Sequence, residues 1–194
     1  MDISYNDVLR RLAIEMGAEF VDGGLLGLTK VRARVRNWTV ILDYTQPESR
    51  ISRPSFRIRA PLRTGDGFRF IAYHKGFLST PRSSMQDVKL GEQELDGDFG
   101  VKATDETKAH ALLADPKVRQ LIQTLSSVDT LSIIDKEHAS GSSLPDGVYL
   151  LWFYRRNYTG DTGEIKSIFE LFAGTLDRLC AIGAASSEAP GYEL

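Results

Sequence analysis

The first apolar residues of the chain recur at helical spacing. Leu12 follows Val8 and Leu9 by four and three positions, and Met16 follows Leu12 by four, which places these residues on one face of a helix. Gly17 follows directly, and glycine is a common stop at the C-terminal end of a helix. The pattern predicts an amphipathic helix of about three turns.

The apolar period then changes to strict alternation in residues 30–45, KVRARVRNWTVILDYT. Two alternating runs are separated by Arg36 and Asn37, the length of a tight hairpin loop. A slip of one residue would bury basic side chains, so the pattern specifies the register. The apolar pairs are Val35 with Trp38, Ala33 with Val40 and Val31 with Leu42. The pairs on the opposite face are Arg34 with Thr39, Arg32 with Ile41 and Lys30 with Asp43.

Two further strands follow in the segments SFRIRAPL and FRFIAYHKG. Arg57 and Arg59 alternate with apolar residues in the first, and Arg69 does so in the second. A simple four-residue loop at 64–67 would place Leu62 and Arg69 on one face. We therefore expect a hairpin with an odd-length loop or a bulge.

The second half of the chain is mainly helical, with two strands. We expect residues 77–103 to be mostly irregular, with a short helix at 85–88. Two helices follow, the first capped by Thr104 and the second beginning at Asp115 and Pro116. Strands at 130–135 and 148–157 precede a long helix whose apolar face starts at Ile165.

This order predicts an α+β fold. A largely antiparallel sheet of four strands, then two more, should pack against N-terminal, central and C-terminal helices. We expect residues 1–185 to form one domain and residues 186–194 to be a flexible tail.

Two segments carry a resemblance to other proteins. Residues 95–122 are similar to uncharacterised bacterial families of unknown function, whose pattern is an acidic turn, Asp-Phe, a Val-rich strand and a Leu-Leu-x-x-Pro break between helices. The matching residues are Asp98, Phe99, Val101, Asp105, Leu112, Leu113, Pro116 and Leu121. The strand, turn and long helix after residue 148 resemble the same families' ending. The resemblance implies a fold and no catalytic residue. A weaker likeness, of topology alone, is to the small chaperones of bacterial type III secretion.

Charge is distributed unevenly along the chain. The net charge is −2, yet residues 30–82 hold twelve Lys and Arg against three acidic residues. If the sheet forms as predicted, seven basic side chains share one surface, which we call the arginine face: Lys30, Arg32, Arg34, Arg36, Arg57, Arg59 and Arg69.

Three interpretations of the arginine face stay open. It can be a solvated surface whose arginines lie over their neighbours. It can be covered by the acidic remainder of the chain, by a second copy or by a protein partner. It can also bind a phosphate backbone, but the pI of about 5.9 and the scarcity of stacking aromatics argue against nucleic acid. Tyr73 is the single clear aromatic candidate on that face.

Catalytic and metal-binding patterns are weak. His74, His110 and His138 have no second His or Cys at metal-ligand spacing, so we expect no metal and no cofactor. The letters DFG at 98–100 stand without the other kinase motifs. No catalytic residue is assigned, and whether the chain is an enzyme stays uncertain.

The single cysteine and the character of residues 1–11 and 165–182 indicate a cellular compartment. Cys180 is the single cysteine, which favours a reducing cytoplasm. Residues 1–11 lack the apolar run of a signal peptide, and residues 165–182 carry too many charges for a membrane span. We expect a cytoplasmic protein without membrane insertion.

Our leading hypothesis is an uncharacterised bacterial protein that acts as a non-catalytic protein-interaction or chaperone-like module, through a protein partner or self-association. One alternative is a polyanion- or nucleic-acid-binding protein that uses the arginine face. The other is an enzyme of unrecognised type.

Overall fold

The computed structural model describes residues 5–24, 28–45, 55–76, 84–89, 91, 97–126, 129–135, 144–156, 160–188, 190–192 and 194. The helices are α1 (Tyr5–Met16), α3 (Glu106–Leu113), α4 (Pro116–Gln123) and α5 (Thr162–Ala181). The strands are β1 (Glu19–Val21), β2 (Lys30–Val35), β3 (Trp38–Thr45), β4 (Ser55–Arg63), β5 (Phe70–His74), β6 (Gln86–Val88), β7 (Phe99–Ala103), β8 (Thr130–Ile134) and β9 (Val148–Arg156).

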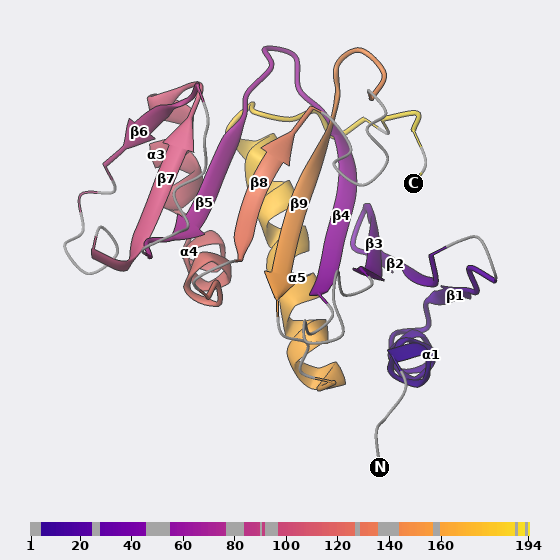
Figure 1. Cartoon of the computed structure of the whole chain (residues 1–194). Coiled ribbons are helices and arrows are strands. Elements are labelled where there is room, and N and C mark those ends of the chain that lie inside the picture. The colour runs from indigo at the N-terminus through magenta and orange to yellow at the C-terminus, as the bar shows by residue number, and fades with distance from the viewer. Residues whose placement is uncertain are drawn as a thin grey trace.

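The described strands form one sheet in the order β1-β2-β3-β4-β9-β8-β5-β7-β6 (Figure 1). Each pair of neighbours is antiparallel. The predicted α+β class with a largely antiparallel sheet is therefore confirmed.

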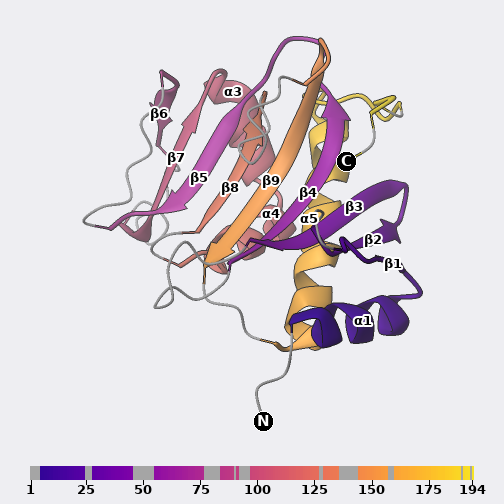
Figure 2. The same ribbon diagram turned by 45° about the vertical axis from the view of Figure 1, so that its right-hand side comes forward.

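Helix α1 lies beside the β1–β3 end of the sheet (Figure 2). Its buried face includes Val8, Leu9 and Leu12. The helix contacts β1, β2 and α5. Gly17 ends it with a φ of 60°, a left-handed conformation that costs glycine little. The prediction of an amphipathic helix here is confirmed.

The first predicted hairpin is confirmed pair by pair. Val35 lies opposite Trp38 and Lys30 opposite Asp43, with every pair between them in the expected register. Arg36 takes the tight turn with a φ of 55°. One face of β2 and β3 is therefore apolar and faces the core, and the other carries the basic residues of β2.

The second predicted hairpin is wrong, because β4 and β5 do not pair. Strands β9 and β8 lie between them, and β9 pairs with β4 over all nine residues of each strand. The reason is the composition of β9, whose consecutive residues Leu150, Leu151, Trp152 and Phe153 are all buried. A strand that is apolar on both faces needs neighbours and cover on each side, which a central position supplies.

The segment before α3 also differs from expectation. Residues 86–88 form the edge strand β6 rather than a helix, and pair with β7. Val88 is buried opposite Val101, while Asp87 forms an ion pair of 3.1 Å with Lys102. The pairing supplies backbone partners and apolar burial that three residues of isolated helix could not.

The two central helices begin with aspartate caps. Asp105, rather than the predicted Thr104, caps α3 by accepting from the backbone N–H of Lys108 at 3.0 Å. The hydroxyl of Thr104 instead accepts from the backbone N–H of Arg69 at 3.0 Å. Asp115 caps α4 ahead of Pro116, as predicted. The positive end of the helix dipole also stabilises a carboxylate at the cap.

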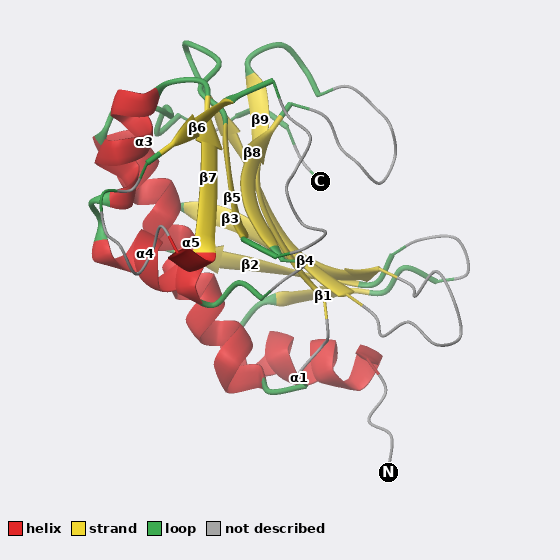
Figure 3. Ribbon diagram, turned by 60° about the vertical axis from the view of Figure 1, so that its left-hand side comes forward, coloured by secondary structure: helices red, strands yellow, loops and turns green. Residues whose placement is uncertain are grey.

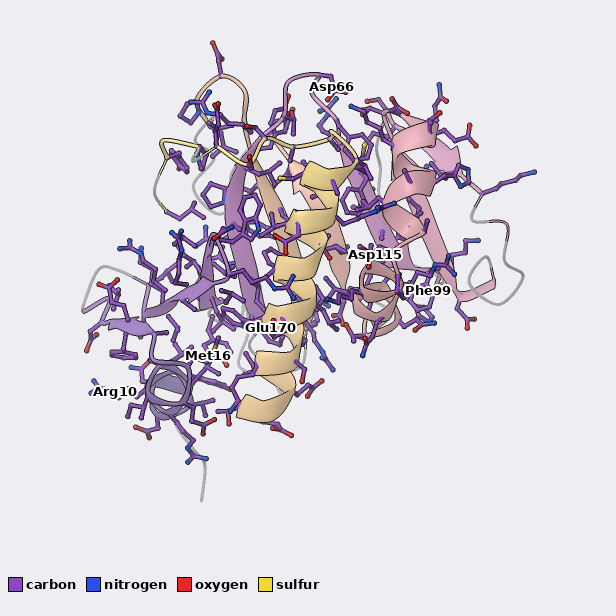
Figure 4. The ribbon with its side chains drawn as sticks, turned by 180° about the vertical axis from the view of Figure 1, so that it is seen from behind. Arg10, Met16, Asp66, Phe99, Asp115 and Glu170 are labelled. Carbon is purple, nitrogen blue, oxygen red and sulfur yellow. The ribbon has the colours of Figure 1, made fainter. Side chains whose placement is uncertain are left out.

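The helices α3, α4 and α5 cover one face of the sheet, called here the inner face, and the main core lies between them (Figure 3). Seen from behind, α5 crosses the back of the sheet, with Glu170 on it and Asp115 at the start of α4 (Figure 4). The other face, the outer face, carries a smaller apolar cluster of Leu144, Val148, Leu150 and Trp152, called the outer cluster.

Candidate functional site

Three members of the arginine face lie side by side on the outer face of β2. Lys30 and Arg32 are half-buried, and Arg34 is exposed. The Nη1 of Arg32 lies 3.3 Å from Oε2 of Glu19 on β1. Arg34 has no hydrogen-bond or ion-pair partner among the residues that the structure describes. Strand β2 therefore presents three cationic side chains on the outer face, and the charge of Arg34 is not paired with an acidic residue in the described part of the chain.

Arg57 and Arg59 lie on the same outer face but are not solvated, which corrects the prediction of a shared exposed surface. Their exposed fractions are 3% and 5%, and Asp43 between them is 0% exposed. The Nε of Arg57 donates to Oδ1 of Asp43 at 2.6 Å, and Arg59 donates to its Oδ2. Both guanidinium carbons lie over the ring of Trp152, at 5.4 and 5.7 Å from the ring centroid.

This buried triad carries one more positive than negative charge. The aromatic ring compensates part of the excess, since a cation over an indole face is attracted by its quadrupole. Nη2 of Arg57 is buried and has no hydrogen-bond partner within the described residues. Alternation along β4 predicted which way these side chains point, but not that Asp43 and Trp152 would bury them.

Arg36 is not on the arginine face, which is a second correction. Its side chain reaches α5 on the inner face. There Nη1 of Arg36 lies 2.5 Å from Oδ2 of Asp177, and Nη2 lies 3.5 Å from Oε2 of Glu170. The hydrogen bond with Asp177 raises the pKa of Arg36. Trp38 donates from Nε1 to Oδ1 of the same aspartate at 2.7 Å. These contacts hold the turn between β2 and β3 against α5.

Arg69 and Tyr73 are also separate from the arginine face, because β5 does not neighbour β4. Five strand spacings of about 4.8 Å separate β2 from β5, roughly 24 Å. Arg69 forms an ion pair with Asp135 at 2.8 Å. Tyr73 is 4% exposed, and its ring lies over Gly100, where a Cβ would approach the ring to 2.4 Å. Tyr73 therefore offers no free stacking surface.

A groove of about 850 Å³ lies along the outer face of β2 and β3. Arg32 and Arg34 contribute charge to one wall, and Ile41 and Pro61 contribute apolar surface. The described residues that line it are Arg32, Arg34, Asn37, Trp38, Thr39, Ile41, Pro61, Ser187, Glu188, Pro190, Gly191, Tyr192 and Leu194.

The second wall of the groove comes from the C-terminal segment, residues 186–194, called here the tail, of which the described residues 187, 188, 190–192 and 194 line the groove. It leaves α5 and pairs through Ser186, whose N–H donates to the backbone oxygen of Arg63 at 2.8 Å. Nε of Arg63 donates to the backbone oxygen of Pro190 at 3.2 Å. The described residues at the end of the tail thus lie on the outer face of the sheet, and the C-terminus is on the side away from the helices (Figure 3). Its flexibility stays a prediction.

The last described residues of the tail contact β2 and the outer cluster. Nζ of Lys30 donates to the backbone oxygen of Leu194 at 2.8 Å, and Nη2 of Arg32 donates to the same oxygen at 3.4 Å. The side chains of Tyr192 and Leu194 pack against the outer cluster. Sequence reasoning missed this role of the tail; the one available signal was the alternation of Tyr192 and Leu194.

The chemistry of the groove is that of a binding surface. Its described lining offers guanidinium donors, hydroxyl and amide groups and apolar side chains, with Glu188 as its one carboxylate. No group of three or more potential metal ligands occurs in the described part of the chain. Cys180, whose thiol pKa is raised by burial and secondarily by the charge of Asp177, lies on α5 away from the groove.

Comparisons with known protein families, curated proteins and solved structures find no match. Among the described helices, none combines the length and apolar character that a membrane crossing requires.

Proposed function

We propose that this chain is a non-catalytic protein-interaction module that binds an extended, acidic segment of another protein in the groove on its outer face. The observation that carries the proposal is a groove whose cationic residue Arg34 has no partner in the described chain, beside apolar surface from Ile41 and Pro61. A chaperone-like role, and a bacterial and cytoplasmic setting, are parts of the same proposal.

Charge on β2 favours an acidic partner. Arg32 and Arg34 both line the groove, and Glu188 alone opposes them there among the described residues. Arginine donates through a planar fork that matches a carboxylate, so a Glu or Asp side chain of a partner can be held at two points. Complementary charge also speeds association and selects against basic partners.

The shape of the groove favours an extended segment. It follows the paired strands β2 and β3, and an extended chain places successive side chains on opposite sides. Acidic residues of such a segment would face Arg32 and Arg34, and the intervening residues would contact Ile41 and Pro61. The volume of about 850 Å³ is within the range in which proteins enclose ligands.

The placement of the other arginines disfavours nucleic acid. Arg57 and Arg59 are buried with Asp43, and Arg36 and Arg69 form ion pairs elsewhere. The remaining outer cations of the predicted face are Lys30, Arg32 and Arg34. Three are few against the roughly six to ten phosphate contacts of a typical DNA-binding protein.

Selection from a library of random eight-residue peptides tests the proposal. Peptides selected on the wild-type chain should be rich in Asp and Glu, and Arg34→Glu should weaken their binding at least tenfold in fluorescence anisotropy. Arg11→Glu, which changes an exposed arginine on α1, is the matched control and should leave binding unchanged.

Two outcomes would contradict the proposal. Selected peptides that bind Arg34→Glu as tightly as wild type would place binding elsewhere. The nucleic-acid alternative would be established instead if no peptide is selected and the wild-type chain binds a 20-base-pair DNA duplex at low salt. Arg34→Glu should then lose this DNA binding.

A further inference from the structure

The tail has the composition expected of a ligand for the groove that it borders. Residues 186–194, SSEAPGYEL, contain two glutamates and no basic residue. The described tail residues line the groove together with Arg32 and Arg34, and Leu194 accepts hydrogen bonds from Lys30 and Arg32. The tail and the outer face are therefore complementary in charge within one chain.

Side chains of the sheet hold the tail by its backbone. Arg63 donates to the oxygen of Pro190, and Lys30 and Arg32 donate to the oxygen of Leu194. Peptide carbonyl oxygens occur all along any peptide, so the contact of Arg63 with Pro190 carries no sequence preference. Specificity must come from the side chains that accompany these contacts.

Two tail side chains supply that specificity. Tyr192 and Leu194 are two positions apart in the sequence. Both are half-buried and pack against the outer cluster. An aromatic residue, one intervening residue and an aliphatic residue form the pattern that the outer face accepts.

We propose that the tail is a competitor built into the chain, and that the partner segment carries the same pattern, an aromatic and an aliphatic residue two positions apart in an acidic stretch. This inference rests on the proposed function, since it names the partner class and the regulation of the groove, which shares Arg32 with the place where the tail lies. A partner gains access to the outer cluster, Lys30 and Arg32 only when the tail leaves them.

Competition within one chain lowers the apparent affinity of a partner. A tethered segment has an effective concentration in the millimolar range, so even weak contacts keep it bound for most of the time. The apparent affinity falls by the fraction of molecules in which the site is open. If the tail is seated in about nine molecules of ten, its release strengthens partner binding about tenfold.

A fluorescein-labelled peptide of residues 186–194 tests the inference by anisotropy on the full chain. Tyr192→Ala with Leu194→Ala releases the tail and should bind the peptide about tenfold more tightly than wild type. Ile14→Ala, which changes an exposed apolar residue on α1 away from the groove, should bind like wild type. Adding Lys30→Ala and Arg32→Ala to the released chain should abolish binding.

A second arm of the experiment changes the peptide instead of the protein. A peptide with alanine in place of the two anchor residues should fail to bind the released chain. Equal binding by this peptide, or equal affinity of the tail peptide for the wild-type and released chains, would overturn the inference. A concentration-dependent dimer that the released variant abolishes would also overturn it, because the tail would then occupy a second copy.

The outcomes separate the two proposals. Acidic library peptides that bind through Arg34, together with a tail peptide that does not bind, would refute the competitor and leave the proposed function standing. Failure of both kinds of peptide would refute both.

Discussion

Replacing Asp43 by asparagine tests how the buried arginines are held. Asp43 is fully buried and is the carboxylate that Arg57 and Arg59 share. Asn keeps the shape of the side chain but removes its charge. Its amide group also places N–H donors against guanidinium groups that are donors themselves.

The expected loss of stability is large. Arg57 and Arg59 are 3% and 5% exposed, so neither can recover its hydration without moving. Breaking a buried ion pair by removing one partner costs about 3–5 kcal/mol, and the stacking on Trp152 recovers part of this. We expect a loss of about 3 kcal/mol, against a total of about 5–15 kcal/mol for a typical domain.

Equilibrium unfolding in urea measures the effect. With a slope of about 2 kcal/mol per molar, the loss should lower the unfolding midpoint by about 1.5 M. Asp135→Asn is the matched control, because its ion pair with Arg69 is about half exposed and should contribute less than about 1 kcal/mol. A loss below about 1 kcal/mol in Asp43→Asn would refute the account of the buried triad.

Two further predictions concern other parts of the fold. Gly100→Ala should destabilise by about 1–3 kcal/mol, because its Cβ would meet the ring of Tyr73, whereas Gly65→Ala should be near neutral in the same urea assay, since a Cβ there meets open space. A hydrogen bond from Lys108 lowers the pKa of Asp66. Its stabilising effect is therefore present above the unfolded pKa of about 3.9 and is lost as the pH falls through the lower folded-state value. Asp66→Asn should be less stable than wild type by under about 1 kcal/mol at pH 7 and equal to it at pH 2; a difference that persists at pH 2 would contradict this assignment.

Local patterns predicted the elements that depend on local contacts. The hairpin of β2 and β3 followed from alternation and a two-residue loop, and α4 followed from Asp115 and Pro116. The neighbours of β4 did not follow, because nothing near residue 63 shows that a strand about ninety residues later will pair with it. The apolar run in β9 indicated burial on both faces, but it did not name the partner strands.

The candidate site was predicted in part for the same reason. Lys30, Arg32 and Arg34 lie together as alternation requires, because they share one strand. Whether Arg57 is exposed depends on a partner aspartate and a distant tryptophan, and the place of Arg69 depends on strand order. These are tertiary properties that side-chain spacing does not encode.

Titration of the isotopically labelled full chain with the tail peptide, followed by NMR, tests the central claim most directly. We expect the largest shift changes at the backbone amides of Arg32, Thr39 and Ile41 along the groove, and larger changes at equal peptide concentration in Tyr192→Ala with Leu194→Ala. Changes confined to the helices α3, α4 and α5, with β2 and β3 unaffected, would contradict binding on the outer face.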